Sequence, residues 1–183
     1  MKSAPARRPS LRLVSASEGE APFSLDDVYR EYCRYVAAVI LRLSGRRSDL
    51  EDLIQEVFAE AASGLGTLRQ PEALRGWLAT IAVRVTRRRL RRHRFYRFIG
   101  LSPADEYDKI ADPAASPFDR ALVRAVYRVL EEVGIDERVA FVLHYVEGET
   151  LDSVAALCRC SRTTAKRRVF RARSELLRRL SDD

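Results

Sequence analysis

Residues 75–97 read RGWLATIAVRVTRRRLRRHRFYR, and this stretch changes from an apolar first half to a basic second half. Its apolar residues recur every three or four positions, which predicts one buried helix face; they are Trp77, Leu78, Ile81, Ala82 and Val85. Residues 83–97 hold eight arginines, one histidine and no acid. We therefore expect a packed helix that presents arginines to a polyanion, with an end that frays beyond His93.

Two more helices are predicted before this one. Ser24 is a candidate cap for the first helix, and Gly45 should end it. Ser48 and Glu51 have the form of a capping box that opens the second helix. Three helices around one aromatic-rich core should make a domain over residues 24–97. Residues 1–23 lack periodic apolar positions and the apolar core of a signal peptide, so we expect a disordered tail.

A second helical domain is expected at residues 118–183. Residues 98–117 contain three prolines among polar residues, which is typical of a flexible linker. Near the end of the chain, TLDSVAAL, a short turn (CRCS) and RTTAKRRVFRARSELLRRL have the proportions of a helix-turn-helix. We predict an all-α chain of two small domains, the second a helix-turn-helix that turns basic residues outward.

The composition excludes several classes of protein. The net charge of +7 favours an acidic partner such as nucleic acid. No apolar run approaches the roughly 18 residues of a membrane span, so we expect a soluble, cytoplasmic protein. Cys33, Cys158 and Cys160 are an odd number of cysteines without framework spacing. Cys158 and Cys160, with His144 as the only nearby histidine, make a poor zinc set. We predict no metal and no cofactor.

The second predicted helix is acidic. Residues 49–60 read DLEDLIQEVFAE, and their polar side chains fall outside the apolar stripe. A solvated amphipathic helix would show the same pattern. In an otherwise basic chain, however, a dense acidic ridge could also bind a basic protein partner.

Four segments in this order resemble one family. DLEDLIQEVF, RGWLATIA running into the arginines, FVLHYVEGETLDSVAAL and TTAKRRVFRAR are similar to bacterial sigma-70 factors. The short extracytoplasmic-function (group 4) form has only conserved regions 2 and 4. The resemblance implies region 2 at residues 24–97, region 4 at residues 118–183, and no enzymatic activity. It also implies four kinds of partner surface: the β′ clamp helices and β flap of core RNA polymerase, promoter DNA and an anti-sigma factor.

The resemblance also implies roles for individual residues. Polymerase would be bound by Asp49, Asp52, Gln55 and Glu56. The −10 promoter element would be bound by Arg69, Trp77, Arg84, Arg87, Arg88 and Arg91. The −35 element would be bound by Arg162, Thr163, Thr164, Lys166, Arg167 and Arg171. The family usually has Asn and Asp at the positions of Arg84 and Arg88, and a glycine at Arg159, so we expect an atypical promoter preference or weaker promoter opening.

Two other functions remain open from the residues alone. A stand-alone helix-turn-helix regulator would bind palindromic sites as a dimer, and would need a spare apolar helix for dimerisation. An enzyme or RNA-binding protein with an incidental basic helix would need an active-site group of residues, but neither His93 nor His144 has a convincing companion.

Overall fold

The computed structural model describes residues 24–68, 70–100 and 115–181, and every regular element within them is helical. The first long helices are α1 (Leu25–Ser44), α2 (Leu50–Gly64) and α3 (Leu74–Phe98). Two short turns of 3-10 helix, η1 (Leu65–Thr67) and η2 (Pro71–Ala73), connect α2 to α3. The predicted all-α class is confirmed. The predicted tail, residues 1–23, lies outside the described residues.

The start of α2 differs from the prediction. The helix begins at Leu50 after Asp49, whose side chain makes no capping hydrogen bond, so the capping box of Ser48 and Glu51 is wrong. Ser24 precedes α1 but its side chain does not cap it either. The apolar stripes decide the helices here, because burial against α3 stabilises them more than a cap does. The buried residues of α1 and α2 include Val28, Val36, Ile40, Leu43, Leu53 and Val57.

Helix α3 continues through the whole arginine-rich stretch. The predicted fraying beyond His93 is wrong, because the helix ends only at Phe98. Leu90 is buried, and His93 Nε2 lies 2.6 Å from Asp49 Oδ2 just before α2. These contacts hold the basic half of α3 against the bundle, so its arginines project from an ordered surface.

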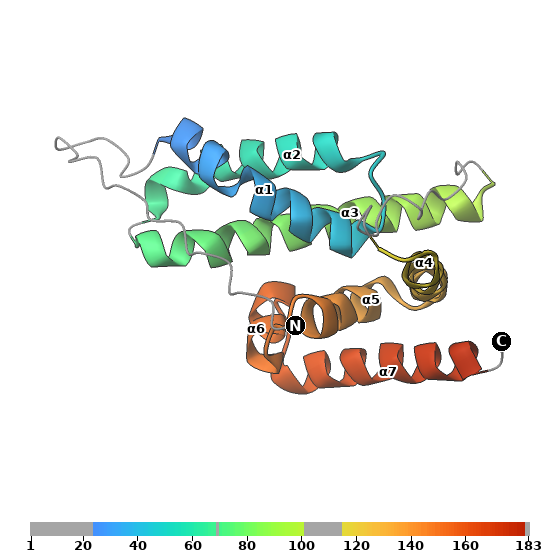
Figure 1. Cartoon of the computed structure of the whole chain (residues 1–183). Coiled ribbons are helices and arrows are strands. Elements are labelled where there is room, and N and C mark those ends of the chain that lie inside the picture. Colours follow the sequence, from blue (N-terminus) through green and yellow to red (C-terminus); the bar gives the residue numbers. More distant parts are fainter. Residues whose placement is uncertain (1–23, 69, 101–114, 182–183) are drawn as a thin grey trace.

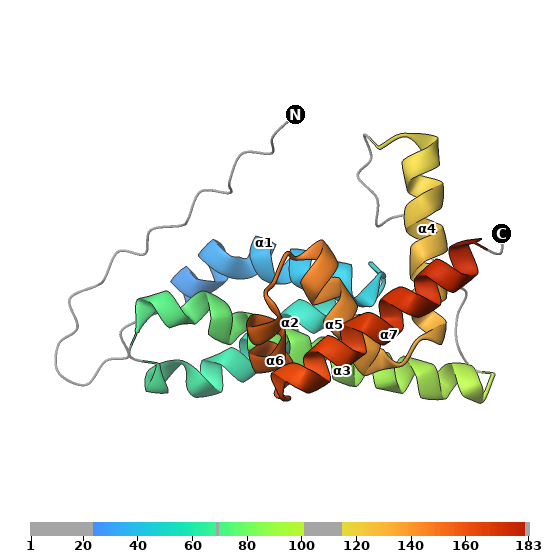
Figure 2. The same ribbon diagram turned by 90° about the horizontal axis from the view of Figure 1, so that it is seen from below.

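The C-terminal half of the chain contains four more α-helices. They are α4 (Pro117–Glu132), α5 (Ile135–Phe141), α6 (Leu151–Cys158) and α7 (Arg162–Ser181), and a π-helical turn, η4 (Val142–Val146), follows α5. Ser116 caps α4 and Ser161 caps α7, because their hydroxyls accept from the amides of Asp119 and Thr164. Figure 2 shows α4 projecting from the edge of the molecule.

The two halves of the chain pack against each other at the C-terminal end of α1. Gly45 ends α1 with a φ of +70°, and a Cβ atom there would lie 2.6 Å from Tyr127 Cδ1. The guanidinium of Arg138 is buried and donates to the carbonyls of Leu43 and Ser44 at 3.1 and 2.6 Å. An arginine from α5 thus binds carbonyls that the end of α1 leaves without helical partners.

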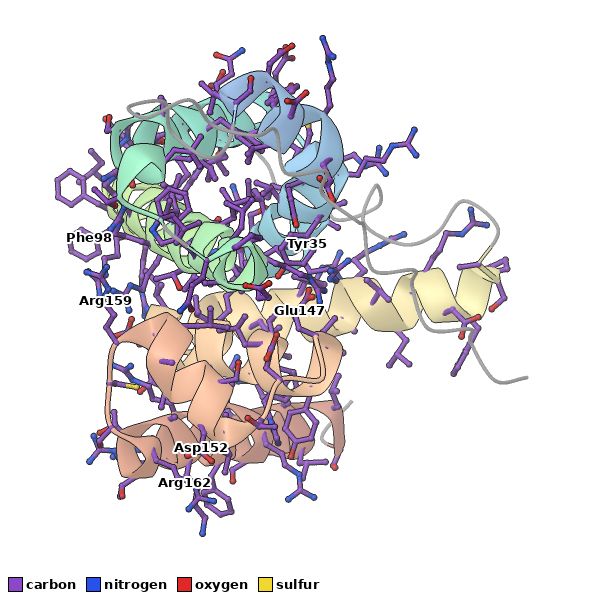
Figure 3. All side chains as sticks on the ribbon, turned by 90° about the vertical axis from the view of Figure 1, so that its left-hand side faces the viewer. Tyr35, Phe98, Glu147, Asp152, Arg159 and Arg162 are labelled. Carbon is purple, nitrogen blue, oxygen red and sulfur yellow. The ribbon has the colours of Figure 1, made fainter. Side chains whose placement is uncertain are left out.

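Ion pairs flank this buried contact. Arg46 Nη2 lies 2.6 Å from Glu131 Oε1, and both side chains are nearly excluded from solvent. Arg42 Nη2 donates to Glu147 Oε2 at 2.8 Å. Figure 3 shows Glu147 at the boundary between the halves, and Figure 1 shows α1, α2 and α3 lying above α5, α6 and α7. Most of the predicted linker, residues 101–114, lies outside the described residues.

Candidate nucleic-acid interface

Two of the predicted −10 arginines are neutralised by acids of α2. Arg84 pairs with Glu60, while Arg88 pairs with Glu56 and, at 3.1 Å, with Glu60. The two acids are four residues apart and so are the two arginines, so one turn of each helix brings both pairs into register. Arg88 remains more than half exposed. This part of the α3 face therefore has less net positive charge than its sequence suggests.

Two more of the predicted −10 arginines, Arg87 and Arg91, face the C-terminal half. Arg87 Nη1 lies 3.6 Å from Asp136 Oδ1 and donates to the Cys158 carbonyl at 3.3 Å. Arg91 Nη2 lies 3.4 Å from the same Asp136 oxygen. Arg168 of α7 donates to the other Asp136 oxygen at 2.8 Å. One carboxylate thus binds arginines of both α3 and α7, so DNA that contacts Arg87 and Arg91 must compete with Asp136.

The remaining predicted −10 residues are Trp77 and Arg69. Trp77 is half-buried at the start of α3, where its ring packs so closely on Gly64 that a Cβ atom there would lie 2.9 Å from Trp77 Cζ2. Trp77 is therefore partly a packing residue. Arg69 lies outside the described residues.

The four predicted polymerase-binding residues do not form one uniform surface. Asp52 and Gln55 are exposed on α2, as predicted. Asp49 is turned toward α3, where its carboxylate lies 3.2 Å from Arg89 Nη1 and 2.6 Å from His93 Nε2. Glu56 is half-buried beside Arg88. Of the four predicted residues, only Asp52 and Gln55 are therefore exposed, and Asp49 holds α3.

The C-terminal helix pair has the geometry of a helix-turn-helix. Thr150 caps α6 by accepting from the Ser153 amide at 3.1 Å, and Arg159 ends α6 in the left-handed region with φ 52° and ψ 54°. The inner stripe of α7 is buried and consists of Ala165, Val169, Ala172 and Leu176. The turn therefore has the left-handed shape that a glycine would give, with an arginine in its place.

The first turns of α7 present the predicted −35 residues. Five are exposed: Arg162, Thr163, Lys166, Arg167 and Arg171. Thr164 is half-buried, and its hydroxyl lies 2.9 Å from the Ser161 hydroxyl. Thr164 therefore contributes to the N-terminal cap of α7. Arg162 Nε lies 3.0 Å from Asp152 Oδ1, and Figure 3 shows this pair on the outer side of the second half.

The cysteines give no sign of a metal centre. Cys158 is buried, whereas Cys33 and Cys160 are half-buried. Burial raises the pKa of the Cys158 thiol to about 11, so it stays protonated at neutral pH. Within residues 24–68, 70–100 and 115–181, no three His, Cys, Asp or Glu side chains lie close enough together to hold a metal ion.

Sequence reasoning missed the acids that pair with the arginines of α3. Glu60 lies in the acidic stretch 49–60 but has no role among the predicted site residues, and Asp136 has none either. The matched spacing of Glu56 and Glu60 with Arg84 and Arg88 was a signal for the first set of pairs. No local pattern predicts the contacts of Asp136, because they depend on how the two halves pack.

Comparison with known proteins identifies the family. The family profile for Sigma-70 region 2 matches residues 28–96, and that for Sigma-70, region 4 matches residues 123–176. The chain is 32% identical over 152 residues to the probable RNA polymerase sigma factor RfaY of Xanthomonas campestris pv. campestris, covering 79% of this chain and 38% of RfaY. It is 28% identical over 172 residues to the ECF RNA polymerase sigma factor SigM of Mycobacterium tuberculosis, covering 93% of this chain and 84% of SigM.

A solved structure agrees with these matches. The sigma factor RpoE of Bartonella quintana, in complex with the anti-sigma factor NepR, superposes with a TM-score of 0.64 at 25% identity. The match covers 86% of this chain and 99% of RpoE. The chain belongs to the sigma-70 family, in its extracytoplasmic-function class. Sigma factors initiate transcription and are not enzymes, which favours the predicted function over a stand-alone regulator. Within the described residues, no helix combines the length and apolar character that crossing a membrane requires.

Proposed function

We propose that this chain binds core RNA polymerase through the exposed part of α2 and directs it to promoters through α3 and α7. The observation that carries the proposal is the pair of basic surfaces on one chain, an arginine-rich helix and a helix-turn-helix, with exposed acids beside the first. A stand-alone regulator needs only the helix-turn-helix. The exposed acids on α2 are a further surface, which a stand-alone regulator does not need and which suits a basic protein partner.

Helix α7 has the chemistry to read duplex DNA. Its N-terminal turns carry Arg162, Lys166 and Arg167, whose cations bind guanine edges or phosphates. In a helix-turn-helix the N-terminal residues of the second helix contact base edges in the major groove. We assign the −35 element to this surface, with Thr163 as a further base or phosphate contact and Thr164 as a capping residue.

Helix α3 would bind the −10 element with reduced attraction. Glu56 and Glu60 already hold Arg84 and Arg88, so a DNA phosphate must displace a carboxylate from each arginine. These ion pairs support weaker promoter opening. A basic side chain of polymerase that binds Glu56 would leave Arg88 paired with Glu60 alone, and would thereby couple polymerase binding to DNA binding.

We infer that the polymerase contact is centred on Asp52 and Gln55. Both side chains are exposed on α2. Asp49 supports the contact from within the fold by holding Arg89 and His93 of α3. The β′ clamp helices are the partner for this surface, and the C-terminal half contacts the β flap.

An anti-sigma factor is a further proposed partner. The solved relative RpoE is in complex with the anti-sigma factor NepR. We propose that this chain is also held inactive by such a protein until transcription is needed, and that it acts in the cytoplasm.

The test of the proposed function is a matched pair of charge reversals. Asp52 and Asp27 are both exposed acids in the first turn of a helix, so each reversal has a similar cost to its helix. We expect Asp52→Arg to weaken binding to purified core polymerase at least about tenfold, which corresponds to roughly 1.4 kcal/mol. Asp27→Arg should bind like the unmodified chain.

Two results would contradict the proposal. One is equal polymerase binding by both variants, and the other is an unmodified chain that fails to bind core polymerase at all.

A second experiment identifies the promoters. Core polymerase and this chain together transcribe a pool of genomic fragments, and the enriched start sites show which promoters are used.

A further inference from the structure

We infer that Arg159, in the turn between α6 and α7, binds a backbone phosphate of duplex DNA when α7 lies in the major groove. This inference rests on the proposed role of α7 in reading the −35 element, and it adds a contact that lies outside that helix. Arg159 is not among the predicted −35 residues. The shape of the turn, the exposure of the side chain and the charges around it all support the contact.

The backbone of this turn would form more easily with a glycine. Arg159 follows the last residue of α6 with φ 52° and ψ 54°. Its amide donates to the Ala156 carbonyl at 3.1 Å, and the amide of Cys160 donates to the Ala155 carbonyl at 2.9 Å. Glycine is the usual residue in such a helix end, because a Cβ atom is unfavourable in the left-handed region. An arginine therefore makes this turn less stable than a glycine would.

The side chain of Arg159 makes no compensating contact in the fold. It is exposed, and within the part of the chain that the structure describes it forms no hydrogen bond and no ion pair. Figure 3 shows Arg159 at the edge of the molecule. A strained residue that its own fold does not use is a candidate for a role in function. The guanidinium of Arg159 is therefore available to a ligand outside the chain.

Other arginines near the start of α7 are already paired with acids. Arg162 Nε lies 3.0 Å from Asp152 Oδ1, and Arg168 Nη2 lies 2.8 Å from Asp136 Oδ2. No acid among the described residues pairs with Arg159, so a phosphate can bind it without first displacing a carboxylate. A guanidinium can bind a phosphate through two parallel hydrogen bonds. Arg159 is thus better prepared for a phosphate than its paired neighbours are.

The position of the turn brings Arg159 to the rim of the groove. In a helix-turn-helix, the N-terminal residues of the second helix contact base edges in the major groove, and α7 begins at Arg162, shortly after Arg159. Base edges lie inside the groove, whereas the phosphates lie along its two rims. Figure 3 shows Arg159 on a different side of the turn from the pair of Arg162 and Asp152. A long cationic side chain just outside the start of α7 is therefore placed for phosphates and not for bases.

The surroundings of the turn favour DNA over an acidic protein as the ligand. Lys166 and Arg167 are exposed on the first turns of α7, and neither forms an ion pair within the described residues. Residues 150–165 include no exposed large apolar side chain. Protein interfaces are built around an apolar core, whereas phosphate contacts need only cations and hydrogen-bond donors.

The test removes the charge of Arg159 while keeping its Cβ atom. We expect Arg159→Gln to bind a promoter duplex about fivefold more weakly at low salt, and the logarithmic salt dependence of its affinity to fall by about 0.9, the value for one phosphate contact. Arg159→Lys keeps the charge and should retain most of the affinity and of the salt dependence. Fluorescence anisotropy of the full chain with a labelled duplex, repeated at several salt concentrations, measures both quantities.

Arg159→Gly separates the phosphate contact from the shape of the turn. It should lose as much duplex affinity as Arg159→Gln although it relieves the strain, whereas a purely structural role for Arg159 predicts unchanged or tighter binding. The loss should be equal on a promoter duplex and on a scrambled duplex, because a phosphate contact carries no sequence information. Arg128→Gln is the matched control, since Arg128 is an exposed arginine of the C-terminal half that lies on α4. It should bind the duplex like the unmodified chain.

Three results would overturn the inference: unmodified affinity and salt dependence in Arg159→Gln, an equal loss in Arg128→Gln, or an equal loss in Arg159→Lys. Loss of core polymerase binding with intact duplex binding in Arg159→Gln would also overturn it, and would show a protein contact instead. An unmodified chain that does not bind the duplex would contradict the proposed function itself, which the Arg159 variants alone cannot do.

Discussion

Arg159 adopts a backbone conformation that ordinarily favours glycine. Its φ of 52° is, within the described residues, the only positive value outside glycine. For a residue with a Cβ atom, the left-handed region costs about 1–2 kcal/mol. The amides of Arg159 and Cys160 donate to carbonyls in the last turn of α6, at 3.1 and 2.9 Å. The turn is thus imposed by these hydrogen bonds and by the docking of α7.

Replacing this arginine with glycine should stabilise the protein. We expect Arg159→Gly to raise the free energy of unfolding by about 0.5–1 kcal/mol, because the relief of strain exceeds the added chain entropy. Urea denaturation measures the change. Arg159→Ala retains the Cβ atom and serves as the control, with no gain expected. A glycine variant that is no more stable than the alanine variant would show that the turn is unstrained.

The helix-turn-helix has an acid next to its first basic residue. Asp152 and Arg162 form an exposed ion pair across the turn, and such pairs contribute little to stability. The pair nevertheless reduces the positive charge at the N-terminus of α7, where DNA should bind. The acid on α6 therefore lowers the affinity of α7 for phosphates.

Removing this acid should tighten duplex binding without unfolding the domain. We expect Asp152→Asn to bind −35 duplex DNA about two- to fivefold more tightly, consistent with up to about 1 kcal/mol for an exposed pair. Electrophoretic mobility shift or anisotropy at fixed salt measures it. Glu132→Gln also removes an acid paired with an α7 arginine, Arg179, but far from the N-terminal turns. If both variants bind the duplex equally more tightly, the effect comes from the net charge of the protein and not from the position of Asp152.

At the scale of the whole molecule, Asp136 connects the two halves. Its carboxylate binds Arg87 and Arg91 of α3 together with Arg168 of α7. Arg138, two residues later, binds the end of α1. The same short helix therefore holds both α1 and α3 against the C-terminal half.

Neutralising Asp136 should loosen this packing. Asp136→Asn leaves half-buried arginines with a weaker partner, so we expect a loss of about 1–3 kcal/mol in unfolding free energy. Arg87 donates to the Cys158 carbonyl, so loosening this interface should expose the nearby thiol of Cys160 to a labelling reagent. A loss of about 1.4 kcal/mol at the interface should make the labelling of Cys160, followed by mass spectrometry, about tenfold faster. Glu132→Gln is again the control. Unchanged labelling in Asp136→Asn would show that the ion pairs do not hold the halves together.

Much of the fold and part of the site could be predicted from the residues. The apolar stripes predicted the long helices, and Gly45 predicted the end of α1. The exposed basic turns of α7 also followed from the position of its stripe. Caps at Ser24 and Ser48 failed, because tertiary packing can set where a helix begins without help from a side chain. Asp49 failed as a surface residue because its partners, Arg89 and His93, are distant in sequence.

Local pattern by itself determined the helices, the family and the basic character of two surfaces, since periodicity and charge act over a few residues. Only the tertiary structure decided which charges are free. Glu56 and Glu60 neutralise Arg84 and Arg88, while Asp136 binds Arg87 and Arg91. The packing of α3 also kept its end helical as far as Phe98. Charge pairing depends on distances between helices, and those distances are fixed only when the cores of both halves form.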